Sequence, residues 1–313
     1  MMIDGPVSSE EEVFYEEANG WLPLRADLSY DIENVCIDLY QAFIDVLMPQ
    51  GFCESTVPLF LSMAGLNSES PMSKEEFEEA LLNVNEMPNL NRVLYLYDCH
   101  KLVSGIQSCS SEVIGLQGEF YRCLNLIDIP KDIMFQNAVI YSSSIKVTSL
   151  MAVLHSIFIR LSSLLDYMAK LTFEIEHLAT DFSKYPKMSS SNILFGKVRL
   201  PNPWKVVGTV FDKCSIIKEI ELIRNHVAHN GWLDDCPKVY LKIENGSVAE
   251  RWVFFPDQTD GCFDRYKNRM SFYSKKDKIN LRLPQLVRDF QSKQLITLKE
   301  ALARLREKSV EIG

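Results

Sequence analysis

The segment SSSIKVTSLMAVLHSIFIRLSSLLDYMAKLTFEIEHL, residues 142–178, decides the fold class of this chain. Its apolar side chains return every three or four positions, which is the period of one face of an α-helix. The residues on this face are Leu150, Leu154, Ile157, Leu161, Leu164, Met168, Leu171 and Ile175. At about 1.5 Å per residue, a helix over the whole segment would be roughly 50 Å long. The segment therefore predicts the central helix of a helical bundle.

Helical periodicity also dominates the sequence before this segment. The pattern predicts one helix over residues 29–51 and another over residues 89–106, with a weaker continuation to about residue 118. Ser73 is followed three positions later by Glu76, which is the spacing of a capping box. We therefore expect a helix to begin at Ser73.

The chain after the central segment alternates between loop and helix. Residues 182–204 are rich in Ser, Pro, Asn and Lys, which predicts a long loop. A helix is expected over residues 207–229, with Asn230 and Gly231 as its C-terminal stop. Two short helices, divided near residues 294–297, are expected at the end of the chain.

Residues 238–255, KVYLKIENGSVAERWVFF, alternate around Asn245 and Gly246, the pair that most favours a tight β-hairpin turn. Together these patterns predict a mainly α fold: an up-and-down helical bundle with a helical N-terminal extension and a small β-hairpin. The expected division is an N-terminal helical region of unknown role over residues 1–130 and the bundle with its hairpin over residues 131–313.

The charge of the chain is unevenly distributed. Its 313 residues are 47% hydrophobic and 24% charged, as in a globular protein, and the formal net charge is -9. Residues 1–30 carry seven Asp/Glu and one Arg, a net of -6, whereas residues 251–313 carry fourteen Lys/Arg and eight Asp/Glu, a net of +6. A polyanion would therefore bind nearer the C-terminus, although two solvated faces of opposite charge would give the same pattern.

Several classes of protein and site are not indicated by the sequence. The eight cysteines include no Cys-x-x-Cys pair, and Cys99 and His100 are neighbours that would point about 100° apart on a helix, so no metal site is predicted. The N-terminus lacks the basic and apolar regions of a signal peptide. Charged residues interrupt the most apolar segment, so no membrane span is predicted. We expect a soluble protein of the reducing cytosol.

The stretch ELIRNHVAHNG, residues 221–231, places an arginine, an asparagine and two histidines within six positions at the end of an expected helix. An arginine suits a phosphate, a histidine can transfer protons near neutral pH, and Asn225 adds a donor and an acceptor. Such a group could cleave RNA through its 2′-hydroxyl without a metal or cofactor. A cationic helix end that complements the helix dipole is the alternative. On an ideal helix Arg224 and His229 lie about 140° apart, so a second copy of the helix would be needed to bring them together.

Arg224 followed by Asn225, three further residues and His229, at the end of an amphipathic helix, resembles the motif of the HEPN superfamily (higher eukaryotes and prokaryotes nucleotide-binding domains). The resemblance implies a HEPN-like bundle over residues 131–313 that forms a homodimer through its motif helices. It implies a metal-independent endoribonuclease of a microbial phage-defence or toxin–antitoxin system, with RNA as substrate and an antitoxin or defence protein as partner. Arg224 would hold the scissile phosphate, His229 would transfer protons, and Asn225 would position them.

The chain also departs from the pattern of this superfamily. Some members carry a Tyr two residues after the His, where this chain has Gly231. An acidic residue from an earlier helix often completes the site, and Asp166 is the candidate, with a capping or salt-bridging role as the alternative. His226 lies inside the stretch but outside the motif, and His155 and His177 are expected to be structural or solvated.

A second function of a different class remains open at this stage. The chain could be a non-catalytic helical protein that uses its bundle for dimerisation or protein interaction. Buried ion pairs on Arg224 and His229 would favour that interpretation, whereas a basic cleft at the motif would favour a ribonuclease.

Overall fold

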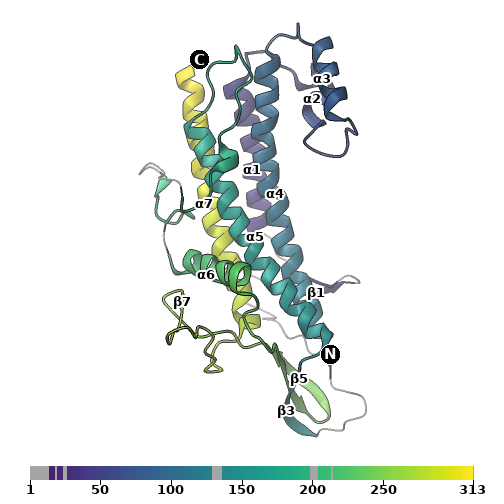
Figure 1. The fold of residues 1–313 in the computed structure, drawn as a ribbon, viewed down its shortest axis with the longest axis vertical. Helices are drawn as coiled ribbons and strands as arrows, with labels where there is room; N and C mark the ends of the chain where they lie inside the picture. The colour runs from purple at the N-terminus through teal and green to yellow at the C-terminus, as the bar shows by residue number, and fades with distance from the viewer. Residues whose placement is uncertain are drawn as a thin grey trace. The chain divides into compact units, whose positions relative to one another are not determined.

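A mainly helical fold with small antiparallel sheets is observed in the computed structural model, which describes residues 14–17, 20–23, 27–128, 136–197, 204–212 and 214–312 (Figure 1). The expected mainly α class is confirmed. The helices are α1 (Asp27–Leu47), α2 (Leu59–Met63), α3 (Lys74–Asn83), α4 (Leu90–Asn125), α5 (Ile145–Glu176), α6 (Ser215–Asn230) and α7 (Ile279–Ile312), with 3-10 turns at Glu54–Thr56 and Ser190–Asn192. The strands are β1 (Phe14–Glu17), β2 (Gly20–Pro23), β3 (Asn137–Ser142), β4 (Val239–Glu244), β5 (Ser247–Trp252), β6 (Gln258–Thr259) and β7 (Cys262–Phe263).

The chain forms two compact units, each assembled from three segments. The first unit comprises residues 1–30, 109–164 and 210–294, and the second comprises residues 31–108, 165–209 and 295–313. The long helices α4, α5 and α7 each supply residues to both units, and both units take residues from either side of position 130. The acidic residues expected to mark the start of the chain lie largely outside the described residues.

A three-stranded antiparallel sheet in the order β3-β4-β5 belongs to the first unit. The expected hairpin is confirmed: β4 and β5 are joined at Asn245 and Gly246, whose φ angles of 52° and 77° fit a turn that needs two left-handed residues. The sequence pattern did not predict β3, which pairs with β4 along its whole length. Val239, Leu241 and Ile243 are buried and alternate with more exposed residues, so one face of the sheet packs on the unit.

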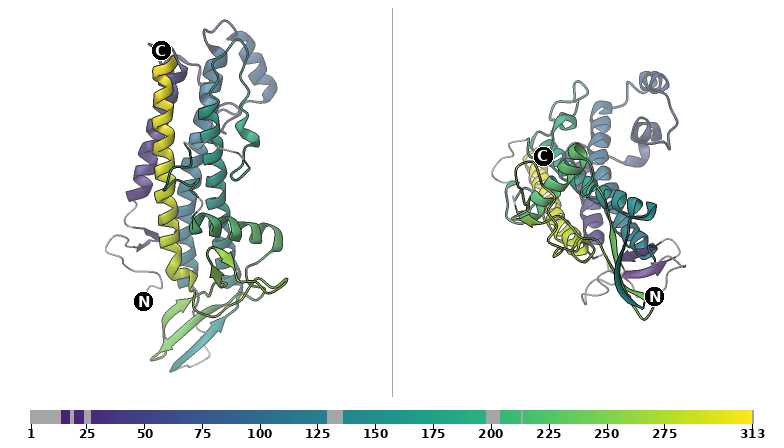
Figure 2. Two further views of the ribbon diagram at one scale, coloured as in Figure 1. Left: turned by 90° about the vertical axis from the view of Figure 1, so that its left-hand side faces the viewer. Right: turned by 60° about the horizontal axis from the view of Figure 1, so that its bottom comes forward.

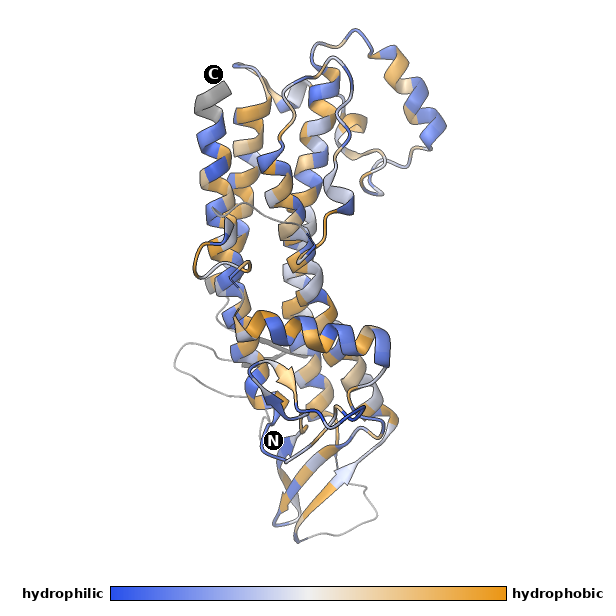
Figure 3. Ribbon diagram, turned by 60° about the vertical axis from the view of Figure 1, so that its left-hand side comes forward, coloured by the Kyte–Doolittle hydropathy of each residue, from blue (hydrophilic) through white to orange (hydrophobic). Residues whose placement is uncertain are grey.

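Helix α7 is continuous, so the expectation of two short helices divided near residues 294–297 is wrong. Gln294 and Thr297 are fully buried, and the Gln294 amide donates to the Ser110 hydroxyl at 2.7 Å. These polar residues resemble a helix break in the sequence, but tertiary contacts stabilise them inside the helix. Colouring by hydropathy shows apolar and polar residues alternating along the long helices (Figure 3).

Pro284 lies inside the first part of α7 and has no N–H to donate to the carbonyl of Asn280, four residues earlier. The Tyr121 hydroxyl of α4 donates to this carbonyl instead, at 2.5 Å. The Asn280 side chain accepts from the backbone N–H of Val253 at 3.1 Å and donates to the carbonyl of Arg251 at 3.3 Å. One buried residue therefore joins α4, α7 and the end of β5.

Helix α6 begins at Ser215, eight residues later than the expected start of its helix at residue 207. Gly208 has a φ of 92°, and this left-handed conformation interrupts a right-handed helix. The end of α6 is as expected, because Gly231 follows Asn230 with a φ of 91°.

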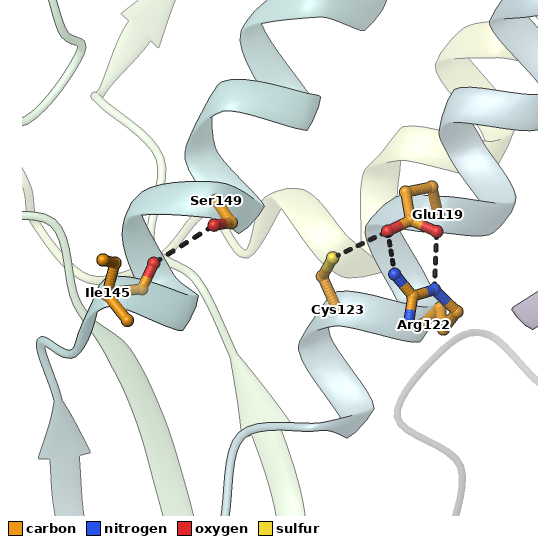
Figure 4. Close-up of polar contacts among 5 residues, drawn as sticks. All are labelled: Glu119, Arg122, Cys123, Ile145 and Ser149. Carbon is orange, nitrogen blue, oxygen red and sulfur yellow. Dashed lines mark hydrogen bonds and ion pairs between the residues drawn. The ribbon is translucent and has the colours of Figure 1, made fainter.

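The last turns of α4 carry a local polar cluster (Figure 4). Arg122 Nε donates to Glu119 Oε2 at 2.6 Å, and the Cys123 thiol donates to Glu119 at 3.2 Å. Burial and the neighbouring carboxylate raise the pKa of Cys123 to about 11. This i, i+3 and i, i+4 pairing extends α4 to Asn125, beyond the expected limit near residue 118.

Figure 4 also shows the start of α5, where the Ser149 hydroxyl donates to the carbonyl of Ile145 at 3.2 Å.

In the second unit, Trp204 fixes the chain that follows α5. Its indole ring is fully buried, its N–H donates to Glu176 at 2.7 Å, and the Arg304 guanidinium lies 4.7 Å from the ring centroid. The expected long loop contains the 3-10 turn at residues 190–192, and its residues 198–203 lie outside the described residues. The expected helix start is confirmed in the same unit, where Ser73 and Glu76 form a complete capping box.

Helix α5 is long and apolar enough to cross a membrane by length and composition alone. Its most apolar stretch has a mean hydropathy of 1.5, and 56% of that stretch is buried inside the protein. The core helix of a soluble protein meets the same criteria, so this single helix is weak evidence for a membrane protein.

The bond between Tyr121 and Asn280 gives a test of the fold. Tyr121→Phe should lower the free energy of unfolding by about 1–3 kcal/mol, because it leaves the buried Asn280 carbonyl without this donor. Urea denaturation measures the change, and Tyr266→Phe, at a 61% exposed position, is the control. Pro284→Ala in the Tyr121→Phe background should restore part of the loss by supplying the missing N–H. Equal stability of Tyr121→Phe and the parent protein would contradict this account.

Candidate functional site

Helix α6 carries the Arg224–His229 motif and runs across α5 and α7, which Figures 1 and 2 both show. It packs on the first unit through a stripe of buried residues with helical spacing, namely Ile217, Glu219, Ile220, Ile223 and His226. Near its start, Glu219 forms a 2.6 Å ion pair with Arg282 of α7. Burial raises the pKa of Glu219, and Arg282 opposes the shift. The start of α6 is therefore held by an ion pair between the buried Glu219 and the partly exposed Arg282.

The β6–β7 turn packs closely against the first turn of α6. Gly261 lies in this turn with a φ of 73°, and a Cβ atom there would come within 2.8 Å of the Ser215 carbonyl oxygen. Only glycine combines this backbone conformation with so close an approach.

Arg224 is held by two neutral side chains. Its Nε donates to the hydroxyl of Ser162, a buried residue of α5, at 3.0 Å, and one of its terminal nitrogens donates to Asn225 Oδ1 at 2.8 Å. In the described part of the chain, neither Arg224 nor His229 forms an ion pair. The guanidinium is therefore oriented while its positive charge is not neutralised by a carboxylate.

His229 is exposed in the last turn of α6. Asn225 lies four residues earlier and is also exposed, so the two side chains share one face of the helix. Arg224 starts from a different face and turns its guanidinium toward Asn225. Asn225 thus links the arginine to the face of the helix that carries the histidine.

His226 points into the protein rather than toward the exposed end of the helix. Its ring N–H donates to the carbonyl of Trp232 at 3.3 Å, and the ring packs edge-on against Phe263 with a centroid distance of 5.5 Å. His155 of α5 packs edge-on against the Trp232 ring at 5.2 Å. Both histidines are 8% exposed. They hold the chain that leaves α6, so their role is structural.

His155 sits in an environment that disfavours its charged form. Burial lowers the pKa of His155 to about 4, and the nearby His226 contributes in the same direction. His100, which is in the second unit, also has its pKa lowered to about 4 by burial. Both rings are therefore neutral at physiological pH, and His155 packs as an aromatic side chain.

Asp166 lies in the second unit, where its carboxylate accepts the backbone N–H of Phe195 at 2.8 Å. This bond anchors the loop after α5. Asp166 thus has a structural partner of its own, and its participation in the chemistry of the motif stays a prediction. His177 is exposed, stacks on Phe173 at 4.1 Å between ring centroids and bonds to the Phe173 carbonyl.

A pocket of about 180 Å³ lies in the first unit next to the segment that follows α6. Lys238, Lys275 and Asp234 supply its charges, and the remaining lining residues are Met151, Pro237, Tyr240, Val253, Phe254 and Tyr273. The residues of the motif do not line it. Among the described residues, no group of three or more His, Cys, Asp or Glu could hold a metal ion.

The arrangement can bind an anion and exchange a proton at one accessible helix end. Arg224 offers a fixed cation, Asn225 an amide, and His229 an exposed imidazole. Sequence reasoning missed Ser162, which orients Arg224, and Trp232, which packs beside the buried histidines. Ser162 could only have been noticed as a small polar residue in an otherwise apolar segment, and nothing in the sequence distinguishes Trp232.

Comparison with models of protein families, with curated proteins and with solved structures found no match to this chain.

The low pKa of His155 predicts a loss of stability in acid. The folded-state pKa of about 4 lies below the ordinary value of 6.5, so the unfolded chain takes up the proton first as the pH falls. Between pH 7 and pH 5 this histidine should lower the free energy of unfolding by about 2 kcal/mol, and the loss should end near pH 4.

Urea denaturation at pH 7 and at pH 5 measures this loss. His155→Gln should show a smaller difference between the two pH values, whereas the control His177→Gln should behave like the parent protein. An unchanged pH dependence in His155→Gln would show that His155 is not buried in its neutral form.

Proposed function

We propose that this chain is a metal-independent endoribonuclease of HEPN type, which cleaves RNA by attack of the 2′-hydroxyl and acts in microbial phage defence or a toxin system. The observation that supports the proposal best is the exposure of the motif residues and the absence of a carboxylate partner for Arg224 among the described residues. Arg224, Asn225 and His229 gather at the exposed end of α6, and Arg224 is oriented by neutral partners alone. A helix end used only for packing would not need an arginine held in this way.

The contacts of the motif also separate this proposal from a purely structural role. A scaffold that uses Arg224 and His229 to hold its own fold would neutralise them in buried ion pairs. Arg224 instead keeps its charge available, and His229 is exposed to solvent. This pattern supports a site that waits for an anionic ligand.

The proposed reaction needs one acid–base group and one fixed cation. The 2′-hydroxyl oxygen attacks the adjacent phosphorus and forms a 2′,3′-cyclic phosphate, while the bond to the 5′-oxygen breaks. In this mechanism His229 transfers the protons that leave the 2′-hydroxyl and reach the 5′-oxygen. Arg224 stabilises the charge that grows on the phosphoryl oxygens, and Asn225 positions the guanidinium. The motif offers these groups without a metal ion.

A homodimer is part of the proposal. Arg224 and His229 start about 140° apart around one helix, so the arginine of one copy and the histidine of another can face each other across a two-fold axis. The proposed nuclease would act in the cytoplasm. Its expected partner is an antitoxin or another defence protein.

Loss of either the arginine or the histidine of the motif should strongly slow cleavage. His229→Ala and Arg224→Ala should each reduce the rate of RNA cleavage about a hundredfold or more, a scale typical of losing an acid–base group or an oxyanion donor. The rate is measured with purified protein and a labelled single-stranded RNA in the presence of EDTA. His177→Ala, which changes an exposed histidine outside the motif, should cleave like the parent.

The outcomes of this assay separate the alternatives. DNA should resist because it lacks the attacking hydroxyl. Circular dichroism and thermal melting of each variant distinguish lost chemistry from lost folding. If a variant that combines Arg224→Ala with His229→Ala cleaves as fast as the parent, or if EDTA abolishes the activity, the nuclease proposal is wrong. The chain would then be a non-catalytic dimerisation or interaction protein.

The proposed dimer can be tested independently of catalysis. Light scattering at roughly tens of micromolar protein should give twice the monomer mass. Ala228→Arg should shift the protein toward monomer, because it places a bulky charge on the exposed end of α6. Ala152→Arg adds the same side chain at an exposed position of α5 and should leave the dimer intact. A parent protein that is monomeric at this concentration would overturn this part of the proposal.

A further inference from the structure

Aromatic side chains form a row across the three-stranded sheet of the first unit. Tyr141 of β3 pairs with Tyr240 of β4, which pairs with Trp252 of β5, so the three residues are direct neighbours on one face. The ring centroids are 6.2 Å apart between Tyr141 and Tyr240 and 5.8 Å apart between Tyr240 and Trp252. Phe254 extends the row with a 4.8 Å edge contact to Tyr240. The row becomes progressively more accessible toward β3, where Tyr141 is 59% exposed.

A lysine lies over each of the three rings of this row that belong to the strands. The Lys238 ammonium is 5.7 Å from the Tyr141 ring centroid, and the Lys275 ammonium is 5.8 Å from that of Tyr240. A third lysine, Lys278, lies 4.4 Å from the Trp252 ring and also pairs with a glutamate. In the described part of the chain Lys238 and Lys275 form no ion pair. The aromatic row is therefore bordered by positive charge.

The segment that supplies Lys275 is strongly basic. Residues 265–276, RYKNRMSFYSKK, contain five Lys/Arg, no Asp/Glu and three aromatic residues. Tyr266 is 61% exposed, and the Lys267 ammonium lies 5.4 Å from its ring. Because the whole chain carries a net charge of -9, this segment is a local reversal of charge. Basic residues interleaved with exposed rings are suited to nucleic acids, which offer flat bases and a chain of phosphates.

The 180 Å³ pocket lies directly beside the row, because Tyr240, Lys238 and Lys275 are among the residues that line it. It is smaller than a typical pocket for a drug-sized ligand, which suits one base or one phosphate rather than a whole nucleotide cofactor. Asp234 in its wall offsets part of the charge of Lys238. Lys275 is therefore the more effective partner for a phosphate.

We propose that this face of the sheet binds single-stranded RNA, with bases stacked along the Tyr141 side of the aromatic row and phosphates held by Lys238, Lys275 and the basic segment 265–276. Paired bases could not stack in this way, because their faces are covered by their neighbours in the duplex. The inference deepens the proposed nuclease function, since it names the single-stranded form as the substrate. It rests on that function only for its biological role and not for the binding itself.

The binding test uses a labelled single-stranded RNA oligonucleotide with 2′-O-methyl groups, which cannot be cleaved through the 2′-oxygen. Its result is therefore independent of nuclease activity. The full chain should bind this probe in a fluorescence anisotropy titration at low salt, and more tightly than it binds a duplex of the same sequence. Tyr141→Ala should weaken binding at least fivefold, the scale of one lost base–aromatic stack, whereas Tyr141→Phe should keep the parent's affinity.

The salt dependence gives a second and separate readout. Lys275→Gln should reduce the slope of log affinity against log salt by about 0.7, because one phosphate contact to a single strand is lost. Tyr141→Ala should weaken binding without changing this slope. The control Lys101→Gln removes an exposed lysine of α4 and should leave both the affinity and the slope unchanged.

Several results would overturn the proposal. The first is that the parent protein does not bind the probe at roughly 100 µM, which is the weak end of the affinity range for non-specific binding. The others are equal affinity for the duplex and unchanged affinity of both Tyr141→Ala and Lys275→Gln. A change of oligomeric state in Tyr141→Ala would assign the face to a protein interface instead. If binding is as expected but unmodified RNA is not cleaved, the binding surface stands and the nuclease proposal fails.

Discussion

The carbonyl oxygen of Asn280 is the constraint on which the first unit depends. Pro284 removes the helical N–H that would normally bond to it, and the Tyr121 hydroxyl of α4 takes that place at 2.5 Å. The side chain of the same residue holds the backbone on both sides of Trp252 at the end of β5. A buried carbonyl without a donor costs roughly 1–3 kcal/mol, so α4 and α7 must meet at this point. The position of the sheet on the helices follows from it.

The two histidines of helix α6 lie on different sides of the helix, one in the protein interior and one in solvent. His226 and His229 are three residues apart, yet the first is buried against Phe263 and the second is exposed. Burial gives the inner histidine a fixed orientation, and it holds the chain through Trp232. The outer histidine keeps access to water and can exchange protons. The two histidines therefore lie in different environments, one buried and one exposed.

Elements that depend on residues close together in the chain were predicted well from the sequence, whereas elements that depend on contacts between distant residues were not. The apolar period of α5, the capping box at Ser73 and the turn at Asn245 each depend on residues close together in the chain, and each is confirmed. The continuity of α7 at the expected break depends on distant contacts such as the bond from Gln294 to Ser110, which lies 184 positions earlier in the chain. Strand β3 likewise becomes a strand only because β4 offers it a partner.

The same limit applies to the site. The residues of the motif could be named from the sequence because they lie within six consecutive positions. Ser162 could not, because its hydroxyl gains a role only where α5 passes α6 and accepts the Arg224 guanidinium. The aromatic row is likewise visible only after three strands are in register, since its members are far apart in the chain. Only seven residues, 231–237, separate Asn230 at the end of α6 from Lys238 beside that row. A chain of this length spans no more than about 30 Å, so the end of the motif helix and Lys238 lie within that distance of each other.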